Sequence, residues 1–204
     1  MYLEQQGDCG GCARLGAAVR SGVRWECVVV PEADEVRVTA LVRGAIAGGQ
    51  WRRMSHLCRL AATAVNGLLA EHPELAEPLR TAPVIWASRF GESVVSSQVL
   101  DRLIDEGPEQ VSPLAFQGSV YNAAVARLSI ALGWTGPTET VSNGDNTLAA
   151  ALEQGRLWAQ QPDGAQGVLV LVGDEAGWAV QRAHGEQVVR DEARAFWVVA
   201  GDPG

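Results

Sequence analysis

The sequence predicts an α/β fold with a mostly parallel five-stranded sheet, helices on both faces and an antiparallel strand at one edge. Two short apolar runs, residues 84–88 and 168–172, are typical of strands buried on both faces. Amphipathic helical patterns separate the predicted strands, in the order β-α-β-α-α-β-α-β-β. Such alternation favours parallel strands joined by helical crossovers. No change in composition suggests a second domain, so residues 1–204 are expected to form one unit.

The first half of the chain shows three segments with strand character and two helical patterns. Strand character appears at residues 1–4 and 27–30, whereas residues 34–48 begin as an alternating strand pattern and become helix-like, which leaves them ambiguous. Apolar residues keep helical spacing from Arg52 to Glu71. After the strand at 84–88, a helix is expected from about Val94 to Asp105. Its core-facing residues are predicted to be Val95, Val99, Leu103 and Ile104.

The second half repeats the alternation. A helix is expected over residues 119–132, with Gly133 as its C-terminal cap. A strand at 138–142 leads to a helix at 147–159 and then to the strand at 168–172. A charged segment, 176–193, connects this strand to a last strand at 196–200, which we expect to be antiparallel at the edge of the sheet.

Composition excludes several classes of function. The net charge is −8 and all 16 basic residues are arginine, which argues against non-specific nucleic-acid binding and excludes any mechanism that needs a lysine amine. No apolar run approaches the ~18–20 residues needed to span a bilayer. The first residues lack a basic segment followed by an apolar one, so we expect no signal peptide and a cytoplasmic location.

The four cysteines do not define a metal site. Cys9 and Cys12 form a CxxC pair without a second CxxC or an HxxxH, so the pair is either a simple loop, a redox pair or part of a metal site. Cys27 and Cys58 lie in apolar patterns and are expected to be buried. We predict no metal and no cofactor.

The most informative segment is a strand–turn–helix junction at residues 141–148. Its turn, Asn143-Gly144-Asp145-Asn146, precedes an Ala/Leu-rich helix that starts near Thr147. Helix N-termini carry unpaired N–H groups and favour negative charge, and many folds hold a nucleophile there. Here the position is occupied by Asp145, and the sequence around it offers no cysteine, lysine or serine–histidine pair.

Several motifs occur in a fixed order: Ser112-Pro113, Asn122-Ala-Ala124, Gly136-Pro137, the turn at Asp145, and an apolar strand ending in Gly173-Asp-Glu-Ala176. With residues 87–92 (Ala-Ser-Arg-Phe-Gly-Glu) and 128–130, this series resembles the N-terminal half of β-ketoacyl synthases, the thiolase-fold condensing enzymes. It is most similar to the short, divergent ketosynthase-like proteins of aryl-polyene and related polyketide systems. The resemblance is best over residues 51–176 and implies a thiolase-like half.

The main departure from that family is chemical. Ketosynthases carry a cysteine nucleophile in the turn, and motif alignment places Asp145 at that position. A carboxylate stabilised at a helix N-terminus is a poor nucleophile toward a thioester. The family's activating histidines come from a second half, and His56, His72 and His184 do not match them by position. We therefore expect no independent activity and no catalytic residue.

Three hypotheses follow from the resemblance. In the first, the chain is a silent subunit that pairs with an active ketosynthase and shapes its acyl pocket, like the chain-length factors of type II polyketide systems. In the second, it is a homodimeric binding or scaffold protein. In the third, it is an enzyme that uses Asp145 as general base. The pocket is expected to be lined by Phe116, Tyr121, Asn122 and Thr147. An acyl carrier protein is a further candidate partner, for which Arg52, Arg53 and Arg59 offer a basic patch. Neither nucleic acid nor membrane is expected as a partner. Arg89 is expected to form an ion pair or to bind a carrier phosphate.

Overall fold

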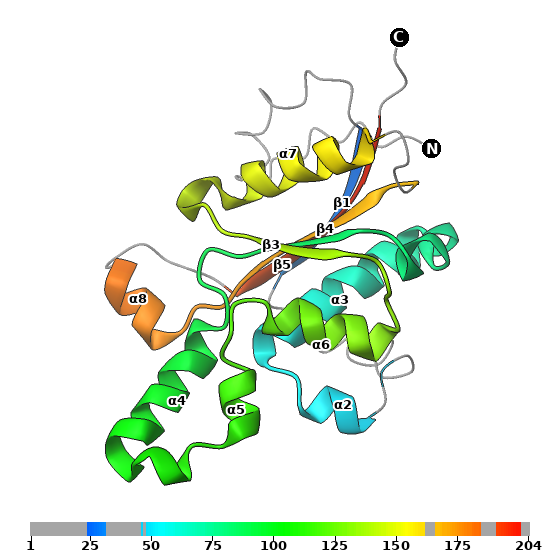
Figure 1. Ribbon diagram of the computed structural model, residues 1–204. Helices are drawn as coiled ribbons and strands as arrows, with labels where there is room; N and C mark the ends of the chain where they lie inside the picture. Colours follow the sequence, from blue (N-terminus) through cyan, green and yellow to red (C-terminus); the bar gives the residue numbers. More distant parts are fainter. Residues whose placement is uncertain (1–23, 32–45, 47, 162–165, 185–190, 201–204) are drawn as a thin grey trace.

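The computed structural model describes residues 24–31, 46, 48–161, 166–184 and 191–200, and these form an α/β unit around one five-stranded sheet (Figure 1). The strand order is β1-β5-β4-β2-β3. The strands are β1 (Arg24–Pro31), β2 (Val84–Ala87), β3 (Thr138–Val141), β4 (Val168–Asp174) and β5 (Glu192–Val199). The predicted strand at 1–4, the ambiguous residues 34–45 and 47, and the pair Cys9 and Cys12 lie outside the described residues.

The predicted α/β class and the five strands are confirmed, but the predicted place of the antiparallel strand is wrong. β2 pairs in parallel with β3 and β4, whereas β5 is antiparallel to both of its neighbours. It lies between β1 and β4 and not at an edge. The physical reason is its length and burial: β5 has eight residues, with the apolar run Phe196–Val198 buried, and an edge position would leave one side of its backbone unpaired.

Helices cover both faces of the sheet. α3 (His56–Glu71) and α6 (Ala123–Leu132) lie on one face, and α7 (Thr147–Ala159) lies on the other (Figure 1). β4 shows the alternation that supports this arrangement: Leu169 and Leu171 pack with the α3 side, whereas Val168, Val170 and Val172 pack with the α7 side. All seven residues of β4 are buried, as its uninterrupted apolar sequence predicts.

Two predicted helices begin later than expected. The helix expected from Arg52 is interrupted, because α2 (Gly48–Arg52) ends there and α3 begins at His56. Ser55 occupies the N-cap of α3, and its Oγ accepts a hydrogen bond from the backbone N–H of Cys58 at 3.1 Å. α6 starts at Ala123 instead of residue 119. The predicted cap Gly133 is confirmed, with a left-handed φ of 68°.

The segment between β2 and α6 projects from the body of the molecule (Figure 1). It contains α4 (Ser93–Glu106), the 3₁₀ turn η5 (Pro108–Gln110) and α5 (Pro113–Gln117), and we call it the α4–α5 arm. The prediction that Leu103 and Ile104 face the core is wrong: they are 41% and 77% exposed, and Val99 is the one buried residue of α4. The outer half of α4 extends beyond the sheet, so no core lies beneath these side chains.

The remaining elements are short. Two 3₁₀ turns, η3 (Pro73–Leu75) and η4 (Pro78–Arg80), occupy the predicted proline-rich loop, and η6 (Gly144–Asn146) precedes α7. α8 (Trp178–His184) lies within the segment expected to be only a charged connection. Cys58 is fully buried, as predicted. In the part of the chain that the structure describes, no helix has the length and apolar character needed to cross a bilayer.

Candidate functional site

The predicted strand–turn–helix junction forms at the end of β3. Gly144 adopts a left-handed φ of 51° and opens the turn η6, which leads directly into α7. The hydroxyl of Thr147 stabilises the turn, because it donates to the carbonyl oxygen of Gly144 at 2.7 Å and accepts from the N–H of Asn143 at 2.9 Å. The side chain of Asp145 points away from this network and is 92% exposed. The turn is therefore held by Thr147 and not by Asp145.

A buried carboxylate lies next to the junction, at the end of β4. Asp174 accepts hydrogen bonds from the Ser88 hydroxyl at 2.9 Å and from both the N–H and the Nε–H of Arg89 at 2.7 Å. These bonds fix the Arg89 guanidinium across the carboxyl ends of β2 and β4. Its Nη1 atom lies 3.9 Å from Oδ1 of Asp145, which is a weak, solvent-exposed ion pair. Arg89 thus forms the ion pair that the sequence led us to expect.

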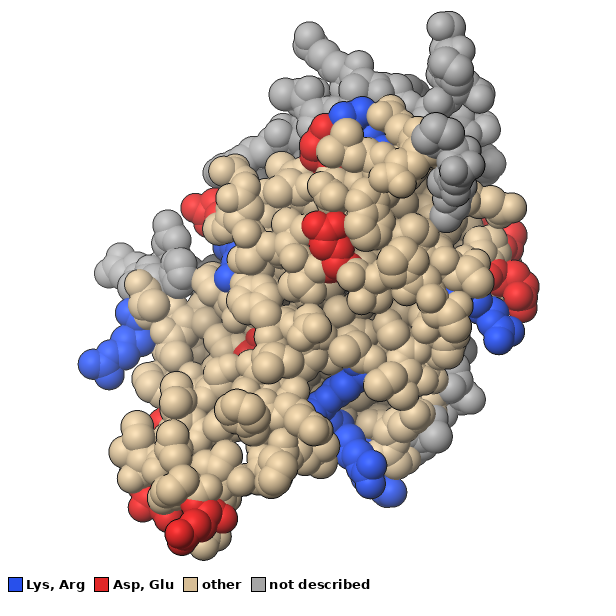
Figure 2. Space-filling view, in the orientation of Figure 1, with Lys and Arg blue, Asp and Glu red and all other residues tan. Residues whose placement is uncertain are grey.

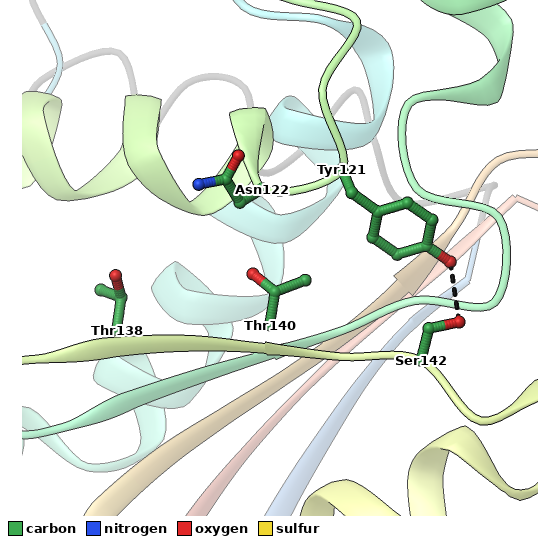
Figure 3. Close-up of a pocket in the computed structure, with 5 residues that line it drawn as sticks. All are labelled: Tyr121, Asn122, Thr138, Thr140 and Ser142. Carbon is green, nitrogen blue, oxygen red and sulfur yellow. Dashed lines mark hydrogen bonds between the residues drawn. The ribbon is translucent and has the colours of Figure 1, made fainter.

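An open pocket of about 490 Å³ lies between the start of α6 and β3 (Figure 3). Its lining consists of hydroxyl and amide groups, with no charged side chain: Tyr121, Asn122, Thr138, Thr140 and Ser142. The last three alternate along the strand and therefore face the same side of it. Tyr121 donates from its phenol to the carbonyl oxygen of Ser88 at 2.8 Å and lies 2.9 Å from Ser142 Oγ. Burial raises the pKa of Tyr121 above its ordinary value, which keeps the phenol protonated.

The structure brings together some of the predicted pocket residues and separates others. Tyr121 and Asn122 line the pocket, whereas Thr147 serves the turn and Phe116 lies on the outside of the arm, where it is exposed. Thr138, Thr140 and Ser142 were not predicted as lining residues. Their spacing was the available signal, because three hydroxyl residues at i, i+2 and i+4 of a strand form one polar row.

A second polar cluster lies at the N-terminus of α3. Glu92 is only 2% exposed, and its Oε1 accepts from the Ser55 hydroxyl at 2.7 Å. Burial and the neighbouring carboxylate of Glu175 raise its pKa to about 7, although the Ser55 hydrogen bond and Arg127 act in the opposite direction. Burial, together with the charge of Glu92, raises the pKa of the Cys58 thiol to about 12. The thiol is therefore inert and packs as an apolar side chain.

Two histidines, His56 and His72, have other partners than the junction. His56 Nε2 lies 3.0 Å from Asp191, and His72 Nδ1 lies 3.1 Å from Glu74. Arg89 is the one charged group paired with Asp145 within the described ranges. The described residues also contain no group of three or more His, Cys, Asp or Glu side chains arranged to bind a metal ion.

Comparison with known proteins assigns this architecture. The family model "Beta-ketoacyl synthase, N-terminal domain" matches residues 31–202. No curated protein matches the chain. Among solved structures, one similar chain belongs to a ketosynthase (ApeO) in complex with its chain length factor (ApeC) from Xenorhabdus doucetiae, at 20% identity and a TM-score of 0.64. The match covers 87% of this chain and 77% of that one.

Two further structures have the same fold. The ishigamide ketosynthase/chain length factor is 18% identical with a TM-score of 0.67, and the match covers 80% of this chain and 48% of that one. A type II ketosynthase complexed with its acyl-carrier protein (AntDE:AntF) is 15% identical with a TM-score of 0.62, covering 88% and 63%. This chain therefore spans only about half to two thirds of these longer relatives. At such identities the likeness establishes the fold alone.

Proposed function

The chain belongs to the family of β-ketoacyl synthase N-terminal domains, and from this premise we propose that it is a catalytically silent subunit. It pairs with an active β-ketoacyl synthase and shapes the pocket that receives the growing acyl or polyketide chain, as a chain-length factor does. The observation that carries the proposal is the junction before α7. It is a strand–turn–helix junction of the kind that holds a nucleophile in many folds, but it presents Asp145.

The surroundings of Asp145 support silence over general-base catalysis. A general base needs a carboxylate with a raised pKa, which requires burial or a neighbouring negative charge. Asp145 is 92% exposed, and its nearest charged group is the positive Arg89. Asp145 therefore lacks the buried environment that this role requires. No histidine contacts this carboxylate in the described part of the chain, so thioester activation has no donor there.

The free edge of the sheet supports pairing with another subunit. β3 hydrogen-bonds to β2 on one side, and no described strand pairs with its other side. Unpaired N–H and C=O groups of an edge strand are a template for a strand of another chain. The same strand supplies the hydroxyl row of the open pocket. A subunit docked along β3 would close that pocket, which is how we propose that the chain shapes an acyl cavity.

The size of one relative is compatible with this role. The match with the chain from the ApeO–ApeC complex covers 87% of this chain and 77% of the other. That chain is therefore only slightly longer than 204 residues. A chain of about this length and fold therefore takes part in a complex of a ketosynthase with a chain length factor. We propose the same kind of assembly here, with an acyl carrier protein as a transient further partner.

The direct test is co-expression with the ketosynthase encoded in the same gene neighbourhood, followed by size-exclusion chromatography with light scattering. We expect a stable one-to-one complex and no condensing activity of the isolated chain. Asp145→Cys should not create such activity, because no histidine among the described side chains is paired with the turn. A wild-type chain that condenses acyl thioesters by itself, or that ignores the ketosynthase and forms only a homodimer, would refute the proposal.

The pocket role has its own readout, the length of the products made by the complex. Thr140→Phe fills the pocket from β3, so we expect shorter products with the ketosynthase still bound. Asp145→Asn is the matched control, since that side chain lies outside the pocket lining and should change neither pairing nor product length. Unchanged products with Thr140→Phe would remove the pocket from the proposal.

A further inference from the structure

The α4–α5 arm exposes most of the large apolar side chains that the described surface contains. Of ten such side chains, six lie between residues 100 and 120, namely Leu100, Leu103, Ile104, Leu114, Phe116 and Val120. Single exposed apolar residues are ordinary, but a local concentration on one projecting element is typical of an interaction site. Leu100, Leu103 and Ile104 follow the i, i+3, i+4 spacing of one helix face.

The same arm is strongly acidic. Between residues 93 and 120 it carries four carboxylates, Asp101, Asp105, Glu106 and Glu109, against one basic residue, Arg102. Figure 2 shows acidic side chains gathered at the outer end of the arm, at the lower left of the view. Within the ranges the structure describes, none of these four carboxylates forms an ion pair. Their charge is therefore uncompensated beside the apolar face.

The arm is also preformed. The hydroxyl of Ser96 on α4 donates to the carbonyl oxygen of Ser119 at 2.8 Å. This hydrogen bond joins α4 to the segment that follows α5. Ser112 caps α5 by accepting from the N–H of Ala115, and Gly118 closes that helix with bonds to Leu114 and Ala115. An element held in this way loses little conformational freedom on binding, which favours affinity.

These three features decide between a second copy and a different partner. Contact between the arms of two copies would bring together the four carboxylates and Arg102 of each, which makes eight carboxylates and two guanidinium groups. Each of these chains also carries a net charge of −8. Like charges within a Debye length of about 8 Å repel, and such juxtaposition is a common means of excluding wrong partners. A groove with an apolar floor and basic residues at its rim satisfies both the apolar face and the carboxylates.

We propose that the arm docks into such a basic-rimmed apolar groove on a different protein, and that its carboxylates disfavour pairing between two copies of this chain. This inference rests on the proposed function in one respect, since it takes the ketosynthase subunit as that protein. It adds to the contact proposed along β3 a second contact, on α4 and α5, and it requires a heteromeric partner.

The test measures affinity for the co-expressed ketosynthase, by titration calorimetry at low and moderate salt. Ile104→Asp should weaken binding about 10- to 100-fold, because it removes a buried apolar contact and adds a carboxylate to the interface. Ile130→Asp on α6 is the matched control: the same substitution at a side chain that is 75% exposed, against 77% for Ile104, but outside the arm. It should change affinity less than twofold. Phe116→Ser is a second arm variant with the same expected direction.

The carboxylates are tested by one variant with Asp101→Asn, Asp105→Asn, Glu106→Gln and Glu109→Gln. We expect it to bind the ketosynthase more weakly with less salt dependence, and to dimerise alone where the wild-type chain is monomeric. Equal affinities for Ile104→Asp and Ile130→Asp would overturn the inference, as would a wild-type homodimer that Ile104→Asp breaks. If no ketosynthase complex forms, the proposed function fails, and the inference is then tested by the oligomeric state of the isolated chain. A neutralised variant that stays monomeric overturns the inference. A neutralised variant that forms a dimer, and loses it when Ile104→Asp is added, supports the inference.

Discussion

Glu92 offers a quantitative prediction that does not depend on function. The carboxyl group is 2% exposed, accepts one hydrogen bond from Ser55, and has no described partner for its Oε2 atom. Burial raises its pKa from the ordinary 4.5 to about 7, Glu175 adds to this, and Ser55 and Arg127 oppose it. The folded chain therefore retains a proton on Glu92 at pH values where the unfolded chain has lost it.

The sign of the effect follows from proton linkage. Between pH 4.5 and about 7 the folded state binds more protons than the unfolded state, so the free energy of unfolding falls as pH rises through this window. At 1.36 kcal/mol per tenfold change, the whole window corresponds to roughly 3 kcal/mol. The sequence pI of about 4.9 makes the acid end prone to precipitation. Between pH 5.5 and pH 8 the free energy of unfolding still falls by roughly 2 kcal/mol.

Glu92→Gln should remove most of this pH dependence. The amide keeps an acceptor for the Ser55 hydroxyl and carries no charge at any pH, so we expect the stability advantage of the variant over the wild type to grow by roughly 2 kcal/mol between pH 5.5 and pH 8. Urea unfolding followed by tryptophan fluorescence, every half pH unit from 5.5 to 8.5, measures both curves. A residual slope from Glu175 is expected, because burial also raises the pKa of that group.

The control for this experiment is Glu71→Gln, the same substitution at an exposed side chain at the C-terminal end of α3, which should change the free energy of unfolding by less than about 0.5 kcal/mol. Two results would contradict the reasoning. If Glu92→Gln and wild type have parallel profiles, Glu92 is ionised in the folded chain throughout. If Glu92→Gln is less stable at every pH, the carboxylate makes an ionic contact that burial does not outweigh.

Two further predictions concern packing at opposite ends of the parallel strands. A Cβ on Gly136 would lie 2.0 Å from the carbonyl oxygen of Ala82. Gly136→Ala should therefore lower the free energy of unfolding, measured by urea titration, by about 1–3 kcal/mol. The control is Gly49→Ala, which should not lower it, because a Cβ on Gly49 would have nothing within 4 Å. Asp174→Ala removes the buried acceptor of Ser88 and Arg89 and should cost about 3 kcal/mol or more by the same assay; a loss below 1 kcal/mol would mean that water replaces the carboxylate.

The sequence predicted those features that depend on the residues of one short segment. The strands β2 and β4 were predicted because each contains an uninterrupted apolar run, Val84–Ala87 and Val168–Val172, which is typical of strands buried on both faces. The turn before α7 was predicted because Gly144 permits a left-handed φ and Asn and Asp favour turns. Pairing partners are not recorded in this way. The apolar run of β5 indicates burial, but nothing in its residues specifies which strands pair with it, so its place between β1 and β4 could not be predicted from periodicity.

Polar residues were harder still to place. Glu92 is a charged residue type that is rarely buried, and its burial results from packing between the starts of α3 and α4, which are distant in sequence. The break before α3 was hidden by a continuous apolar pattern, although Ser55 is a preferred N-cap residue. The hydroxyl row of the pocket was visible only as alternation within one strand, and its significance required the position of β3 at the edge of the sheet.

The wrong prediction for α4 is the most informative of these differences. Periodicity reports which side chains are selected to be buried, whereas the structure of one chain reports which are buried within that chain. Val99 satisfies both, but Leu103 and Ile104 keep core-like spacing where this chain supplies no core. If the spacing is maintained because these side chains are buried, another molecule must bury them. The disagreement between pattern and structure at Leu103 and Ile104 thus has the same physical origin as the docking surface, and the Ile104→Asp affinity measurement examines both.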